Sequence, residues 1–235
     1  MSAMPDPSAS RRGPLWLHPD DDLAPNRPGE YLRGLPELSV AESVARRALG
    51  RLLGRRADLD ELERRLTGEI LVGTALDRLE PTGRRTLHSL PLPARAVLAH
   101  LTIGPGGIFA VHTVNPAGAR VVLGVPGRKG DIGVTADMIR IGSRVEPHPR
   151  LCRRAASRAA HVLRRAAGGP VEVRPVLAVV APRIRVGHRP SDLLVLGIPA
   201  GVPPAVLDGG TPVLKPDRVE ELYDLARDRR IWYDG

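Results

Sequence analysis

The residues best suited to bind a charged ligand are six arginines in the segment from residue 150 to residue 167. At 100° per residue, a helix here places them on one arc, opposite an arc of apolar residues. Arginines in such a row can contact the phosphates of a nucleic acid, although a solvated helix face explains the pattern equally simply. The arginines are Arg150, Arg153, Arg154, Arg158, Arg164 and Arg165.

The whole chain is rich in arginine, so the six arginines alone do not establish a phosphate-binding surface. The 235 residues include 35 basic and 26 acidic side chains, for a net charge of +9, and the only lysines are Lys129 and Lys215. Together with 25 glycines and 24 prolines, this bias is typical of a GC-rich genome. A positive protein attracts polyanions nonspecifically, and the low aromatic content of 3% gives no support for base stacking.

The histidines and the single cysteine do not predict a metal centre or a redox site. Cys152 is the only cysteine, which excludes an internal disulfide and a multi-cysteine zinc site. The segment Gly104–Gly107 lies between two predicted strands, so it is not a phosphate-binding loop that opens a helix. We expect four histidines in loops or on exposed surface, with no pair at ligand spacing: His88, His148, His161 and His188.

The elements that must position these residues predict an α/β protein with a central mixed β-sheet flanked by helices. Apolar residues recur at helical spacing in 39–56, 58–79, 150–167 and, less strongly, from residue 216 to 230. The stretch 126–146 predicts one or two edge strands. Further strands are predicted at 84–90, 95–104, 107–114, 119–125, 171–180 and 192–198.

Composition divides the chain into four parts. Residues 1–38 predict a disordered or weakly ordered arm because they are rich in Pro, Asp, Ser and Gly without periodicity. A helix at 39–56, a main domain at 57–200 and a C-terminal extension with a helix at 201–235 follow. The chain has no apolar run of membrane-spanning length and no signal-peptide core, so we expect a cytoplasmic protein without a membrane partner.

Three ordered motifs resemble the NERD domain, the nuclease-related domain of bacterial proteins. They are TGEILVGTALDRL at 67–79, HLTIGPGGIFAVHTV at 100–114, and VRPVLAVV at 173–180, with a helix after PHPRLC between the last two. The likeness covers roughly residues 68–180. It implies a divergent PD-(D/E)xK fold, that is, a restriction-endonuclease-like core preceded here by N-terminal helices and the arm.

Members of that fold cleave phosphodiesters with a metal ion, and the chemistry explains the residue types that they need. Two carboxylates on adjacent strands hold Mg²⁺ or Mn²⁺ through hard oxygen ligands. The metal helps to generate hydroxide and neutralises charge on the phosphoryl group. A lysine two residues after the second carboxylate lies on the same sheet face and stabilises the transition state.

When this pattern is transferred to the chain, most of the required side chains are missing at the matching positions. The helix glutamate is retained as Glu69, but Ala99 occupies the position of the first strand carboxylate. His112 occupies that of the second carboxylate, and Val114 that of the lysine. A supporting glutamine would fall near Cys152. The resemblance therefore implies a pseudoenzyme with vestigial site positions, no catalytic residue and no bound metal.

Three hypotheses follow. The first is a catalytically inactive nuclease-like module that binds DNA or RNA through the six arginines. The second is an active metal-dependent nuclease with relocated ligands, which alone would require Mg²⁺, Mn²⁺ or a transition metal between Glu69 and His112. The third is a protein-interaction scaffold that uses residues 1–38 or the C-terminal sequence IWYDG.

Overall fold

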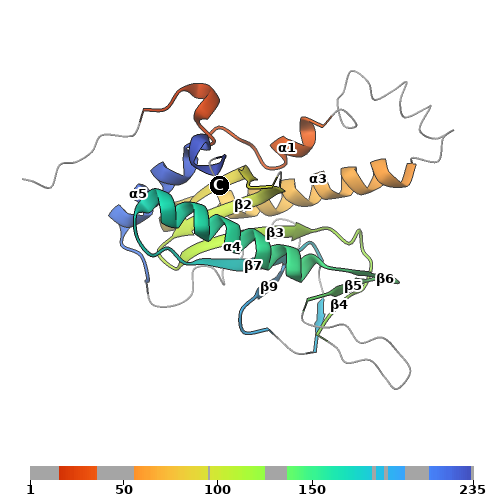
Figure 1. Ribbon diagram of the computed structural model, residues 1–235. Coiled ribbons are helices and arrows are strands. Elements are labelled where there is room, and N and C mark those ends of the chain that lie inside the picture. The colour runs from red at the N-terminus through yellow and green to blue at the C-terminus, as the bar shows by residue number, and fades with distance from the viewer. Residues whose placement is uncertain are drawn as a thin grey trace, which may run out of the picture.

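The computed structural model describes residues 16–35, 56–94, 96–124, 137–181, 184–187, 190–198 and 212–233 (Figure 1). A five-stranded sheet forms its centre. The strands, in spatial order, are β1 (Arg85–Leu92), β2 (Ala96–Gly104), β3 (Gly107–Val114), β7 (Val173–Val179) and β9 (Leu194–Gly197). The first three are antiparallel neighbours, β7 runs parallel to β3, and β9 runs parallel to β7. The prediction of an α/β protein with a mixed sheet is confirmed.

Strands β2 and β3 form the predicted hairpin. Gly104 pairs with Gly107 across the tight turn, and Gly107 has a φ of 115°, a conformation that favours glycine. Farther along the hairpin His100 pairs with Val111. The next residues along the two strands are Ala99 and His112, which therefore lie next to each other at the end of the paired region.

Helices cover both faces of this sheet, namely α3 (Arg56–Asp77), α4 (His148–Ala167) and α5 (Pro216–Arg227). Side chains alternate along β3 between the two faces. Phe109 and Val111 pack in a cluster with residues of α3, while Ile108 and Ala110 pack with residues of α4 and α5. Figure 1 shows α4 crossing one face of the sheet. Both faces are thus buried, which accounts for the nearly continuous apolar sequence of the central strands.

A second, smaller sheet lies beside the end of β3. Its strands, in spatial order, are β6 (Arg144–Glu146), β5 (Ile139–Ile141), β4 (Val121–Leu123) and β8 (Ile184–Val186). The prediction of one or two edge strands within 126–146 is confirmed for β6, which lies at an edge, whereas β5 is paired on both sides. Residues 126–136 lie outside the described residues. Strand β8 was not predicted, because three residues are too few to show an alternating pattern.

Residues 16–35 differ from the weakly ordered arm predicted for 1–38. They contain a 3₁₀ turn, η1 (Pro19–Asp21), and a short helix, α1 (Glu30–Arg33). Leu23 and Leu32 are fully buried, and Asp22 forms a two-pronged ion pair with Arg227 of α5. This stretch is therefore packed on the domain. The rest of the predicted arm and the predicted helix at 39–56, apart from Arg56 at the start of α3, lie outside the described residues.

The C-terminal residues also belong to the main packed core. Helix α5 is followed by a 3₁₀ turn, η5 (Arg229–Trp232). Trp232 is buried and its Nε1 donates a hydrogen bond of 2.9 Å to the carbonyl of Ala226, whereas Tyr233 is exposed. Within the ranges that the structure describes, no helix combines the length and apolarity needed to cross a membrane.

Candidate functional site

The four positions singled out by the nuclease-like pattern meet at one cleft. Glu69, Ala99, His112 and Val114 all line an open cleft of about 640 Å³. Its walls come from α3, the ends of β2 and β3, the β5–β6 hairpin and the first turn of α4. The positions that the resemblance selected on three separate elements thus lie together in the structure.

Close packing of α3 against the end of β3 places Glu69 at the cleft. A Cβ atom on Gly68 would lie 2.8 Å from the Asn115 side chain and 3.2 Å from that of Thr113, so only glycine allows this approach. The Asn115 amide then donates a hydrogen bond of 3.0 Å to the carbonyl of Arg64 in α3. Gly68 therefore serves the close packing of α3 against the end of β3.

Glu69 is a buried carboxyl without a partner. Only 8% of the residue is exposed, and within the described part of the chain no group forms a hydrogen bond or an ion pair with it. Burial raises the pKa of Glu69 to about 7, against a smaller lowering effect of the Arg65 charge. Near neutral pH the carboxyl therefore exists in both its charged and its neutral form.

A hydrogen-bonded chain of three side chains forms the opposite wall. Nε2 of His112 lies 3.0 Å from Nδ1 of His148, and Nε2 of His148 lies 2.7 Å from the carboxylate of Glu146. Both contacts are satisfied if His148 donates to Glu146 and His112 donates to His148. Burial, as the main cause, lowers the pKa of His112 to about 3 and also lowers that of His148. Both rings are therefore neutral at pH 7.

This chain corrects the expectation that His148 stands alone. The sequence predicts His148 as an isolated surface histidine, but it is the first residue of α4 and bonds to His112 of β3. A local signal was present, because Glu146 and His148 are separated only by Pro147 at the start of a helix. The partner of His148 on β3 could not be found, since it lies 36 residues away.

The donor atoms at the cleft do not fit the magnesium or manganese site that the resemblance implies. Ala99 offers no oxygen and Val114 offers neither charge nor a donor, while His148 and Glu146 bond to each other. Among the residues with described positions, no group of three or more His, Cys, Asp or Glu side chains could hold a metal ion. Cys152 is buried, which raises the pKa of its thiol to about 12.

The six arginines of α4 divide into two sets. Arg153 forms a two-pronged ion pair with Asp192 and a further one with Asp137, and Arg164 donates to the carbonyl of Val171. These two arginines attach α4 to neighbouring segments, so their role is partly structural.

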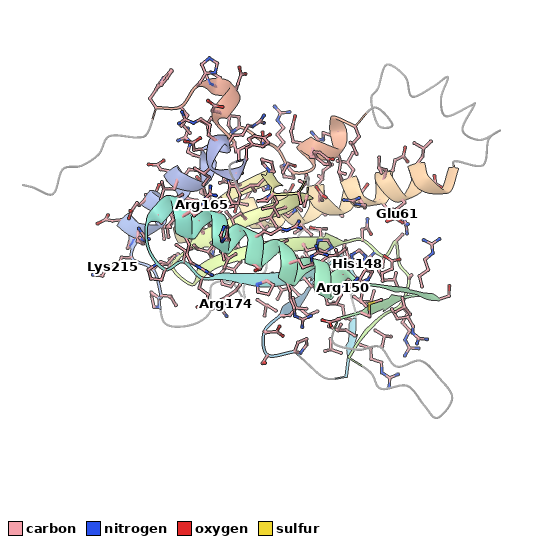
Figure 2. All side chains as sticks on the ribbon, viewed as in Figure 1. Glu61, His148, Arg150, Arg165, Arg174 and Lys215 are labelled. Carbon is pink, nitrogen blue, oxygen red and sulfur yellow. The ribbon has the colours of Figure 1, made fainter. Side chains whose placement is uncertain are left out.

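Three of the remaining arginines follow one face of α4 from the cleft, with Arg154 and Arg165 exposed and Arg158 partly buried. Leu151 lines the cleft, and Arg154, Arg158 and Arg165 lie three, seven and fourteen residues farther along the same helix face. Arg150 lies beside the start of the stripe, and Figure 2 shows it close to His148, with Arg165 at the other end of α4. We call Arg154, Arg158 and Arg165 the arginine stripe.

A second histidine pair lies in the closed interior between α3 and the sheet. Nδ1 of His88 in β1 lies 2.8 Å from Nδ1 of His100 in β2, and Nε2 of His88 lies 3.0 Å from the carboxylate of Asp77. The sequence predicts His88 in a loop or on exposed surface. This prediction is wrong, because His88 is buried in β1 and the β1–β2 register places it opposite His100.

Comparisons with known proteins do not assign the chain to a group. No family model, no curated protein and no solved structure matches it. The function of the cleft must therefore be inferred from its own residues and their surroundings.

Proposed function

We propose that the protein is a NERD-like module with a PD-(D/E)xK nuclease fold that binds DNA or RNA and has lost metal-dependent cleavage. One observation carries this proposal. Leu151, which lines the cleft that contains Glu69, Ala99, His112 and Val114, lies on the same face of α4 as the arginine stripe. A nucleic acid that follows the stripe would thus reach the place where a working relative would cut it.

The element order supports a restriction-endonuclease-like core. A long helix, three antiparallel strands, a second helix and a strand parallel to the third occur in the order α3, β1, β2, β3, α4 and β7, with β4, β5 and β6 of the second sheet between β3 and α4. The two positions that would carry the strand carboxylates, Ala99 and His112, lie at the adjacent ends of β2 and β3. This is the arrangement that the nuclease chemistry requires, with its carboxylates replaced.

Charge supports a nucleic acid as the ligand. Arginine side chains at successive exposed turns of a helix can contact successive phosphates of a backbone. The chain as a whole carries a net charge of +9, which favours association with polyanions and makes it sensitive to salt. Arg64, Arg65 and Arg144 also line the cleft, beside the carboxyl groups of Glu61, Glu69 and Glu146.

Binding is tested by reversing charge on the arginine stripe. Arg154→Glu combined with Arg158→Glu should weaken retention of DNA or RNA about 100-fold at roughly 100 mM salt. The matched control is Arg33→Glu with Arg185→Glu, which changes net charge equally at two exposed positions outside the stripe. Equal losses of affinity in the two double variants would mean that the stripe contributes only through the net charge of the protein. Unchanged binding by the first variant would contradict the proposal.

Loss of cleavage is tested separately with supercoiled plasmid in Mg²⁺ and in Mn²⁺. The proposal predicts that the plasmid stays intact, because Ala99 and Val114 replace a metal ligand and the catalytic cation. Nicking that disappears in Glu69→Gln would instead assign the protein as an active nuclease with relocated ligands.

A further inference from the structure

The unpartnered carboxyl of Glu69 is the unusual feature of the cleft. Buried polar groups almost always have hydrogen-bond partners, and one that lacks them costs stability. Glu69 is more than nine-tenths buried, lines the cleft, and has no hydrogen-bond partner among the described residues. Its two oxygens are therefore available to a ligand that enters the cleft with N–H donors.

The geometry of a carboxylate selects one kind of donor. Its two oxygens accept two parallel N–H bonds side by side, as in carboxylate–guanidinium pairs. Guanine offers such a pair through N1–H and the N2 amino group. Adenine and cytosine offer one donor beside one acceptor, and uracil offers one donor between two carbonyl groups. An ionised Glu69 thus complements guanine better than any other common base.

An arginine side chain of a protein partner has the same paired donors, but the surrounding charge disfavours it. Arg64, Arg65 and Arg144 line the cleft together with Glu61, Glu69 and Glu146, so the charges inside the cleft balance. The excess positive charge lies outside it, in the arginine stripe and in the net charge of +9. This excess repels a basic peptide and attracts the phosphates attached to a nucleotide. The volume of about 640 Å³ lies within the usual range for small-molecule sites and is ample for a base.

We propose that the cleft binds an unstacked guanine base, whose N1–H and N2 amino groups donate to the carboxylate of Glu69. This inference rests on the proposed function, because the strand that carries the base is the one whose phosphates follow the arginine stripe. A free guanine nucleotide has the same base and is the second source of this chemistry.

The environment of Glu69 agrees with such a ligand. Burial raises its pKa to about 7, and the Arg65 charge offsets this only in part. Two N–H donors from a base would stabilise the charged form and lower this pKa. Guanine binding near pH 7 should therefore release part of a proton, which calorimetry in two buffers of different ionisation enthalpy detects.

The experiment compares ligands that differ only at the base. Calorimetry on the full chain measures binding of GMP, IMP, AMP, CMP and UMP, where IMP is a guanine analogue without the N2 amino group. A second arm uses oligouridylates that carry one central guanine or one central adenine. We expect guanine to bind about tenfold more tightly than hypoxanthine or adenine, since one bidentate contact is lost. The mononucleotides report a free nucleotide, and the oligonucleotides report a base within a strand.

Two variants decide whether Glu69 is responsible. Glu69→Gln keeps the size of the side chain but replaces one acceptor by a donor, so the guanine preference should disappear. Glu61→Gln is the matched control, because Glu61 also lines the cleft but already pairs with Arg64, and it should keep the preference. Circular dichroism verifies that both variants are folded.

A guanine preference that survives Glu69→Gln would overturn the inference, and so would equal binding of the guanine and adenine oligouridylates. The proposed function fails differently. If oligonucleotides are retained without a base preference and Arg154→Glu with Arg158→Glu abolishes retention, only the guanine site is rejected. If nothing is retained at all, both proposals are rejected.

Discussion

Two pairs of histidines, one within the five-stranded sheet and one joining that sheet to α4, differ in what surrounds them. In each pair the ring nitrogens lie about one hydrogen bond apart, at 3.0 Å for His112 and His148 and at 2.8 Å for His88 and His100. In each, one ring also bonds to a carboxylate. One pair lines an open cleft that leads to the arginine stripe, and the other is sealed in the interior.

The sealing comes from the neighbouring segments. A Cβ atom on Gly73 of α3 would lie 2.5 Å from the Pro28 side chain and 3.1 Å from the His100 ring, so helix, N-terminal segment and ring are in direct contact. No comparable segment covers His112 among the described residues, because β2 and β3 end beside the cleft. Access to ligand is thus decided by what packs over a polar cluster, and the cluster alone does not indicate a site.

Disrupting the packing of α3 and the N-terminal segment over the closed histidine pair should have the largest effect on stability. Gly73→Val would place side-chain atoms inside Pro28 and against His100, and we expect a loss of about 3 kcal/mol in the free energy of unfolding, measured by urea denaturation. Gly169→Val is the control, since a Cβ there meets nothing closer than 4.0 Å. Similar losses for both variants would show that the N-terminal segment does not close over α3.

Acid should destabilise the closed pair next most strongly. Burial, and then the neighbouring His88 and His112, hold the pKa of His100 well below 6.5. The unfolded chain therefore takes up the proton first, and stability falls as the pH drops below 6.5, by about 1.4 kcal/mol per pH unit. Between pH 6.5 and pH 5 this amounts to about 2 kcal/mol.

Titratable groups of the cleft also change stability with pH, so the unfolding measurement must isolate the contribution of His100. His112, with its pKa lowered to about 3, acts in the same direction as His100. Glu69, with its pKa raised to about 7, acts in the opposite direction between pH 4.5 and pH 7. Urea unfolding of His100→Leu should therefore show a pH slope smaller than that of the wild type by about 1.4 kcal/mol per unit. Identical slopes would mean that His100 is not buried in its neutral form.

Removing one ring from the open pair should have the smallest effect. His148→Ala deletes a partly exposed hydrogen-bonded ring, and we expect a loss of about 1 kcal/mol because water can replace it. His88→Ala in the closed pair leaves His100 without its partner and should cost about 2 kcal/mol. Thermal unfolding of the two variants measures the order, and the reverse order would contradict the contrast between open and closed pairs.

Local patterns predicted most of the fold but little of the polar chemistry. The hairpin at 104–107 and the helix α4 follow from turn residues and helical spacing, which act within a few neighbours. The contact of His88 with His100 depends on strand register, and that of His112 with His148 joins a strand to a helix. The packing of residues 16–35 was missed because Leu23 and Leu32 show no periodicity in a proline-rich stretch.

The resemblance to a nuclease pattern gave more than local spacing could. It selected Glu69, Ala99, His112 and Val114, and all four line one cleft. It gave no hint of the Glu146–His148 wall or of the ion pairs that hold Arg153. Those contacts involve the second sheet and the segment around Asp192, whose positions depend on the complete fold.

The most direct test of the account measures how salt affects nucleic-acid binding by the arginine stripe. Fluorescence anisotropy with a labelled single strand gives the slope of log K against log salt for the wild type and for Arg154→Gln with Arg158→Gln. If both arginines contact phosphates, the slope should become shallower by about 1.4, or 0.7 for each lost contact. Equal slopes for the two proteins would contradict the claim that a nucleic acid lies along α4 and enters the cleft.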